Sequence, residues 1–118
     1  MAKYLVLIYG DERAWAEAPA EWHAANARRH QAFHATAGSS ILGANELEPV
    51  ARAVSVRAGK SGRASVTDGP FLETKEVVGG YYLLEAPDID EAVRLASELP
   101  EASAPHGGVE IRPIAPIA

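Results

Sequence analysis

The 118-residue sequence predicts a single α+β domain, and two kinds of pattern lead to this class. Residues 4–9 and 77–85 are apolar at both alternating positions, which is typical of strands that are covered on both faces. Residues 19–37 and 88–99 have the composition and the end signals of helices. Strands and helices therefore share one chain that is long enough to bury a core.

Each helix is predicted from the residues at its ends. Pro19 suits the first helical position, Glu21 suits the positive end of the helix dipole, and Gly38 suits a left-handed cap. In the second helix, Asp88 is the expected cap, with Glu91 three residues later. Both helices therefore have defined starts and stops.

A hairpin is predicted between the two helices. Residues 53–57 alternate between apolar and polar side chains, residues 59–62 form a Gly-rich turn, and residues 63–67 return as the partner strand. The segment DGPF then ends the hairpin, and its Gly69 is expected to adopt a positive φ.

The order of elements is that of a ferredoxin-like βαββαβ fold with an extra hairpin strand. Its strands are 4–9, 53–57, 77–85 and the alternating residues 109–112, while residues 39–52 show no clear pattern. The two doubly apolar strands would be the inner ones. Because two helices cover only one face of such a sheet, we expect the other face to be covered in a homodimer.

Composition and charge exclude several classes of protein. The formal net charge is −5 and the 11 basic residues are scattered, so no direct nucleic-acid partner is expected. The absence of cysteine excludes disulfides and thiolate chemistry. No apolar run approaches the ~20 residues that span a bilayer, and the N-terminus does not have the pattern of a signal peptide. We therefore expect a cytoplasmic protein without a membrane partner.

Four motifs carry a resemblance to a known family. These motifs are TDGPF, ETKE, GGYYLLEA and EIRPI. With these motifs at this spacing, the chain resembles the DGPF branch of the YCII-related family, from Met1 to about Ile114. The resemblance implies a ferredoxin-like α+β fold that dimerises into an α/β barrel. It also implies an association with sigma-factor systems, in which members of this branch often occur.

Three histidines are the first candidates for a functional site. His23, His30 and His34 fall on one stripe of the first helix, where they could face a ligand. The alternative is that they lie at the border between core and solvent. No carboxylate shares their stripe, so a metal would need Asp68 or Glu73 from elsewhere, and no metal is predicted.

A charged group after the DGPF turn is the second candidate. Asp68, Glu73, Lys75 and Glu76 could floor a polar pocket that binds a ligand or positions a proton. The alternative is a turn-forming aspartate followed by surface ion pairs that contribute little. Arg112 could anchor an anionic ligand, or it could form a salt bridge across the sheet edge.

The wider YCII-related family includes proteins with a proposed His–Asp dyad, whose positions fall near Ala27 and at Leu99 in this chain. Neither position carries the dyad residue. We therefore predict that His30, with Asp68 or Glu73, is the catalytic group. The predicted ligand-binding residues are His23, His34, Lys75 and Arg112.

Two functions are consistent with these residues. The first is a dimeric protein that binds a polar small molecule, without a cofactor, and could act on it as an acid–base isomerase or lyase. The second is a non-catalytic accessory or regulatory protein of a sigma-factor-linked transcription system. No phosphate-binding glycine motif, metalloprotease motif or nucleophile elbow is present.

Overall fold

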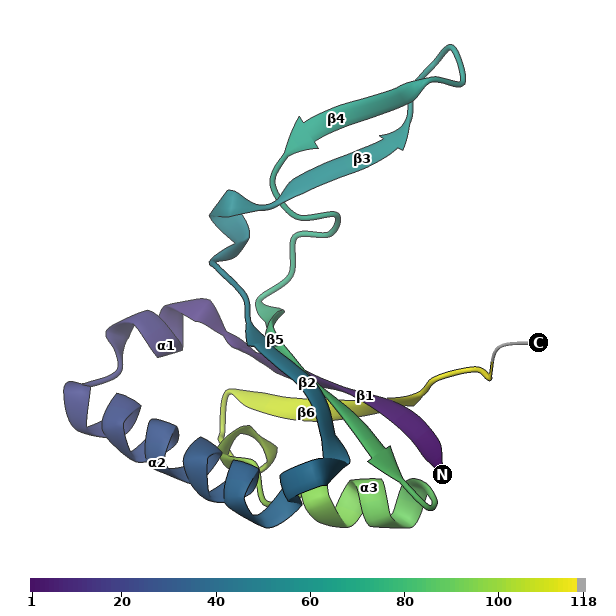
Figure 1. The fold of residues 1–118 in the computed structure, drawn as a ribbon. Coiled ribbons are helices and arrows are strands. Elements are labelled where there is room, and N and C mark those ends of the chain that lie inside the picture. Colours follow the sequence, from purple (N-terminus) through teal and green to yellow (C-terminus); the bar gives the residue numbers. More distant parts are fainter. Residues whose placement is uncertain (117–118) are drawn as a thin grey trace.

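The computed structural model describes residues 1–116 of the chain. Figure 1 shows the elements, which are β1 (Ala2–Asp11), α1 (Glu12–Glu17), α2 (Ala20–Ala37), β2 (Ile41–Glu46), β3 (Val54–Ala58), β4 (Ala64–Asp68), β5 (Glu76–Ala86), α3 (Ile89–Ala96) and β6 (Gly107–Pro113). Short 3₁₀ turns connect them, namely η1 (Gly38–Ser40), η2 (Val50–Arg52) and η3 (Pro100–Ala102).

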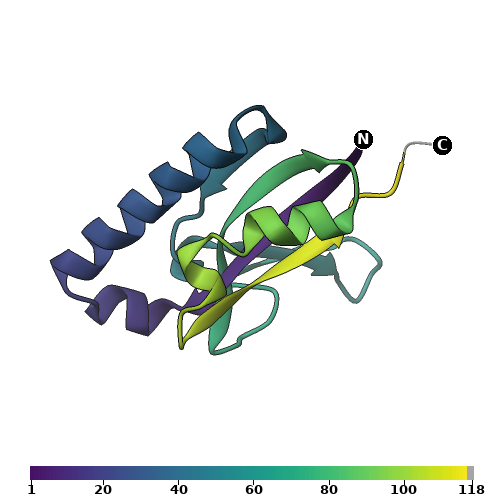
Figure 2. The same cartoon turned by 90° about the horizontal axis from the view of Figure 1, so that it is seen from below.

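The main sheet has four strands in the order β2-β5-β1-β6, and all of its neighbouring strands are antiparallel. This order is that of a ferredoxin-like sheet, so the predicted α+β fold class is confirmed. The strands that are apolar at both alternating positions, β1 and β5, are the two inner ones as predicted. Figure 2 shows α3 across the front of this sheet and α2 running beside it.

One strand assignment from the sequence is wrong. Residues 53–57 were predicted to be the second strand of the main sheet, but that place belongs to β2, in a segment without a clear pattern. The sequence of β2 does not show a strand pattern, because it contains the weak strand formers Gly43 and Asn45. A sheet edge tolerates such residues when its one neighbouring strand supplies the pairing. Strands β3 and β4 pair only with each other, and Figure 1 shows their hairpin projecting away from the sheet and the helices.

The core lies between the helices and one face of the sheet. Alternate side chains of β1 and β5, including Val6 and Leu84, are fully buried there against Phe33 of α2 and Leu99 after α3. The side chains on the opposite face, such as Leu5 and Leu7 of β1, are only partly buried. The sheet therefore has one covered face and one open face.

The helix ends follow the sequence closely. The Asp88 side chain accepts a hydrogen bond of 2.9 Å from the backbone N–H of Glu91, as predicted for a cap. Gly38 ends α2 with φ of 52°, and α2 begins at Ala20, one residue later than expected, with Pro19 as its cap. The N-terminal half of α2 has no buried residue; only Phe33 and Ala37 are buried.

Trp15 of α1 packs over a bulge in the sheet. The pairing of β1 with β5 shifts register between Ile8 and Tyr9, and Gly79 is the extra residue. A Cβ atom at Gly10 or Gly79 would overlap the indole of Trp15, so glycine at both positions makes room for it. Gly69, directly after the hairpin of β3 and β4, has φ of 103°, so the predicted positive φ of this glycine is confirmed.

None of the helices within residues 1–116 is long and apolar enough to cross a membrane.

Candidate functional site

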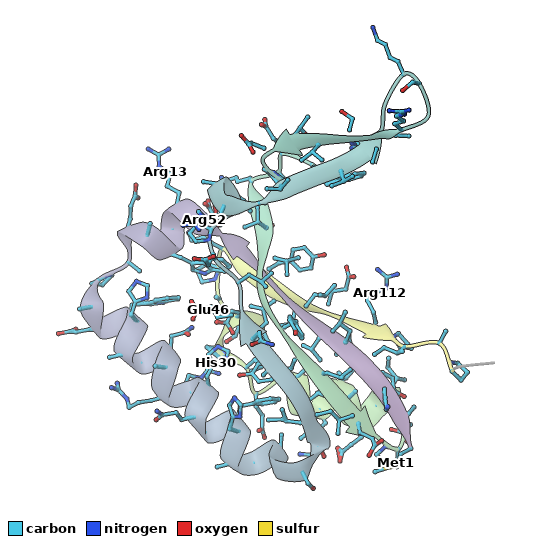
Figure 3. The ribbon with its side chains drawn as sticks, turned by 45° about the horizontal axis from the view of Figure 1, so that its top comes forward. Met1, Arg13, His30, Glu46, Arg52 and Arg112 are labelled. Atoms are coloured by element: carbon cyan, nitrogen blue, oxygen red, sulfur yellow. The ribbon has the colours of Figure 1, made fainter. Side chains whose placement is uncertain are left out.

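A pocket opens between α2 and the edge of the main sheet. Its volume is about 660 Å³, within the range of sites that bind small molecules. Figure 3 shows His30 projecting from α2 toward the sheet, with Glu46 near the end of β2. The pocket is lined by residues from α1, α2, the three strands β1, β2 and β5, and η3.

The three predicted histidines all lie along one wall of this pocket. His23 and His34 are exposed, whereas the side chain of His30 is 22% exposed because it faces the sheet. His30 lies two turns after His23 and one turn before His34, on one face of α2. The structure therefore brings together His23, His30 and His34, as the sequence predicted.

The carboxylate beside His30 is Glu101. The His30 Nε2 atom lies 3.0 Å from the Glu101 carboxylate, whose side chain is only 8% exposed. The amide of Asn26, one turn earlier on α2, donates a second hydrogen bond of 3.0 Å to the same oxygen, Oε2. The other oxygen, Oε1, is buried and also lies 3.0 Å from Nε2 of His30, but it accepts no well-aligned hydrogen bond from residues 1–116.

Pro100 explains why this carboxylate is buried. It starts the η3 turn directly after the fully buried Leu99, and the backbone N–H of Ala102 closes the turn onto the Leu99 carbonyl. Glu101 is therefore turned back under α2.

Tyr82 of β5 connects His30 to His34. Its hydroxyl lies 2.7 Å from Nδ1 of His30 and 3.4 Å from Nε2 of His34. The rings of His30 and Tyr82 are nearly parallel, at 12°, and Phe33 packs edge-on against Tyr82 with a centroid separation of 4.8 Å. Four side chains thus form one series, in the order His34, Tyr82, His30 and Glu101.

Burial and charge shift the pKa of two members of this series, Glu101 and Tyr82. Burial alone would raise the pKa of Glu101, but hydrogen bonds from His30 and Asn26 and the charge of His30 hold that pKa below its usual value. Burial, with the nearby charge of Glu101, raises the pKa of Tyr82 to about 12. At neutral pH, Glu101 is therefore a carboxylate and Tyr82 a neutral hydroxyl.

The Glu101 carboxylate sets the direction of one hydrogen bond. A carboxylate only accepts, so His30 donates from Nε2 to Glu101. The other two bonds of the series depend on the tautomers of the histidines. In the tautomers that leave Nδ1 of both His30 and His34 unprotonated, the Tyr82 hydroxyl donates to His30 and accepts from Nε2 of His34.

The rest of the pocket is formed by aromatic and polar groups. Trp15 and Trp22 contribute indole rings, and the amide of Asn45 on β2 donates a 2.9 Å hydrogen bond to the hydroxyl of Tyr81. Trp22 is 37% exposed and meets the ring of His23 edge-on. A bound molecule would thus meet flat rings on one side and hydrogen-bonding groups on the other.

The other predicted site residues lie elsewhere. Asp68 ends β4, where it pairs with Val54, and Glu73 and Lys75 follow in the connection to β5. None of these residues lines the pocket of the single chain, so Glu101, and not Asp68 or Glu73, is the carboxylate that contacts His30.

Arg112 is also placed outside this pocket. Figure 3 shows it on β6, away from His30. Its guanidinium lies 3.4 Å from Glu110 of the same strand, so the salt bridge proposed across the sheet edge is formed along the strand instead. The Arg112 side chain is 69% exposed, and this ion pair therefore contributes little to stability.

Glu101 was missed, although the resemblance contained a signal for it. The family's acidic position falls at Leu99, two residues before Glu101, and its histidine position falls near Ala27, one turn before His30. Ala27 lines the same pocket. Both members of the pair are therefore displaced along the chain yet still meet. Among residues 1–116, no three His, Cys, Asp or Glu side chains are grouped closely enough to hold a metal ion.

Comparisons with known proteins agree with this fold. The chain matches the family described as "YCII-related domain" over residues 2–118. It is also 34% identical, over 117 residues, to an uncharacterized protein of Rhizobium meliloti (strain 1021), with 95% of this chain and 91% of that protein covered. The match spans nearly the whole chain, and the protein therefore belongs to the YCII-related family.

Proposed function

We propose that this protein binds a polar metabolite in the pocket beside α2 and transfers a proton on it without a metal, as an isomerase or lyase. One observation supports this function above the others. A series of hydrogen bonds begins at an exposed imidazole in the pocket and ends at a buried carboxylate. Such a series makes an imidazole a better base, as when an acid orients a catalytic histidine.

His34 is the residue that would contact the reacting atoms. It takes a proton from the ligand at Nδ1 and becomes an imidazolium, which donates from Nε2 to the oxygen of Tyr82. Tyr82 in turn donates to His30, and His30 donates to Glu101. His30 and Glu101 are positioning residues, since both ring nitrogens of His30 are already engaged by protein groups.

The atom to which His34 then delivers the proton determines the type of reaction. If His34 returns it to a different atom of the ligand, the ligand is isomerised. If His34 gives it to a departing hydroxyl or amine, the electron pair of the broken C–H bond forms a double bond and the ligand is cleaved as in a lyase reaction. Both outcomes regenerate neutral His34, so neither needs an oxidant or a reductant.

The experiment begins with ligands and ends with proton exchange. A thermal-shift screen against uncharged and charged metabolites identifies molecules that raise the melting temperature by mass action. Each hit is then incubated with the protein in D₂O, and NMR records the loss of its exchangeable C–H signal. We expect exchange to depend on pH and to fall about 100-fold in His34→Gln.

Matched variants separate the proposed roles. His30→Gln and Glu101→Gln should lower the exchange rate and shift its pH profile. These variants keep the proposed base, His34, but alter the hydrogen bonds that support it. His106→Gln is the control, since His106 is exposed and does not line the pocket. Hits that bind but never exchange would contradict the catalytic proposal and favour the non-catalytic accessory role.

We also propose that the protein is a homodimer, as predicted from the sequence. The open face of the sheet carries partly buried leucines, including the directly paired Leu5 and Leu83. On the projecting hairpin, the paired Val56 and Val66 are 56% and 64% exposed, with Val54 on the same face at 58%. Two apolar surfaces of one chain thus lack a partner.

Charge supports a second copy as that partner. Residues 50–67 carry four basic and no acidic side chains, so the hairpin region is +4 and the rest of the chain −9, for a total of −5. A positive arm and a negative body are complementary between two identical chains. Light scattering should give twice the mass of 12.5 kDa. A stable, folded monomer at micromolar concentration would overturn this proposal.

A further inference from the structure

We infer that the ligand of this pocket is a hydroxylated aromatic molecule that carries no negative charge. This inference rests on the proposed function for the location of its site and goes further by naming the class of ligand. It is drawn from the groups that line the pocket, namely their charges, their rings and their hydrogen-bonding atoms.

The lining charges disfavour an anion. Within the described residues 1–116, the pocket is lined by two carboxylates, Glu46 and Glu101, and by no lysine or arginine. Proteins hold ligand carboxylates and phosphates with arginine, lysine, protonated histidine or the N-terminus of a helix. Of the three histidines in this lining, His30 has both ring nitrogens engaged by Tyr82 and Glu101. An anionic ligand in this pocket would be repelled by the carboxylates of Glu46 and Glu101.

The rings favour a flat ligand. Trp15 and Trp22 line the pocket, and Trp15 is held in place over Gly10 and Gly79. Aromatic walls bind planar rings by stacking and edge contacts, and they attract cations through the faces of their rings. An aromatic ligand, neutral or cationic, therefore fits both the walls and the charges.

The interior supplies a partner for a hydroxyl. The imidazole of His34 lines the pocket, and its Nε2 atom lies 3.4 Å from the hydroxyl of Tyr82. A phenolic or benzylic hydroxyl can donate to an unprotonated ring nitrogen of this imidazole. This contact would hold the ligand beside the proposed base.

The two tryptophans of the chain, Trp15 and Trp22, both line the pocket, so intrinsic fluorescence reports directly on its occupancy. Three probes share one phenol ring and differ in charge, namely para-hydroxybenzyl alcohol, tyramine and para-hydroxybenzoate. We expect the neutral and cationic probes to quench the emission at concentrations roughly tenfold lower than the anionic one. The methyl ether of the neutral probe, which cannot donate from the phenolic oxygen, should bind more weakly than its parent.

A variant at the mouth tests the cause of this preference. Glu46 is exposed, so Glu46→Gln should fold normally, and it should raise the affinity for para-hydroxybenzoate severalfold while leaving that for para-hydroxybenzyl alcohol unchanged. Glu110→Gln, on β6 outside the pocket, is the matched control and should change neither affinity. Equal or tighter binding of the anion in the unaltered protein would overturn the inference, as would quenching by none of the three probes.

The outcomes for ligand class and for catalysis can be distinguished. Charge-selective binding without any proton exchange would support the ligand class and contradict the acid–base function. Exchange on an anionic hit would support the function and contradict the ligand class.

Discussion

Replacing Glu101 with alanine tests the site most directly, because its carboxylate holds two elements together. The side chain is 8% exposed and accepts hydrogen bonds of 3.0 Å from both His30 and Asn26 of α2. Hydrogen bonds to a charged group contribute about 1.5–3 kcal/mol each. Because the His30 side chain is still 22% exposed, water can replace part of its bond, and we expect a total loss of about 2–4 kcal/mol.

The measurement is equilibrium unfolding in urea across a range of pH. Folding lowers the pKa of Glu101, so its stabilisation is present above the ordinary glutamate pKa of 4.5 and is lost as pH falls through the folded value. The stability difference between the unaltered protein and Glu101→Ala should therefore be largest near neutral pH and shrink in acid. Glu110→Gln, whose side chain is 46% exposed, should change stability by less than about 0.5 kcal/mol.

Two results would refute this reasoning. One is a Glu101→Ala protein as stable as the Glu110→Gln control at neutral pH. The other is a constant stability difference down to about pH 3, which would mean that the Glu101 charge contributes nothing.

Three further perturbations test separate parts of the structure. Spectroscopic titration should show Tyr82 ionising near pH 12. Its raised pKa stabilises the fold below the ordinary tyrosine value of 10, and this contribution is lost as pH rises through 12. A Tyr82→Phe protein that keeps the step near pH 12 would contradict the assignment. Gly69→Ala should lower the unfolding free energy by about 1 kcal/mol or more, because φ is 103° there; no loss in urea unfolding would count against it. Gly79→Ala should displace Trp15, shift the Trp15 emission to the red and lower the unfolding free energy by about 1–3 kcal/mol. Gly43→Ala is the control, because its added Cβ would meet only an ordinary contact at 3.9 Å and should leave the emission unchanged.

The framework of the fold could be predicted because its signals are local. The inner strands are apolar at both alternating positions, and Asp88 and Gly38 mark helix ends by chemistry that acts within a few residues. The edge strand β2 could not be predicted, since the pairing that defines it is with β5, about forty residues later in the chain. Spacing alone also does not identify the buried face of α3. Ile89, Val93 and Ala96 recur at helical spacing, yet Ile89 and Val93 are 40% and 45% exposed, whereas Ala92 and Ala96 are buried.

The site was half predictable for the same reason. The histidine stripe is a property of one helix, so periodicity alone places His23, His30 and His34 together. The choice of carboxylate depends on where two distant turns come to lie. Asp68 and Glu73 were favoured because they precede the inner strand β5, but the hairpin that carries them leaves the main sheet. Glu101 looked like an ordinary surface residue, since no local pattern marks a buried glutamate.

The topology itself explains why Glu101 meets His30. Helix α2 follows the inner strand β1, α3 follows the inner strand β5, and both helices lie on the covered face of the sheet. The chain that leaves α3 must therefore turn beside α2 before it reaches the edge strand β6, and η3 is that turn. A polar residue on η3 faces the middle of α2, and the side chain of β5 beneath them, Tyr82, completes the contact. The contact between His30 and Glu101 is thus built from both halves of the fold.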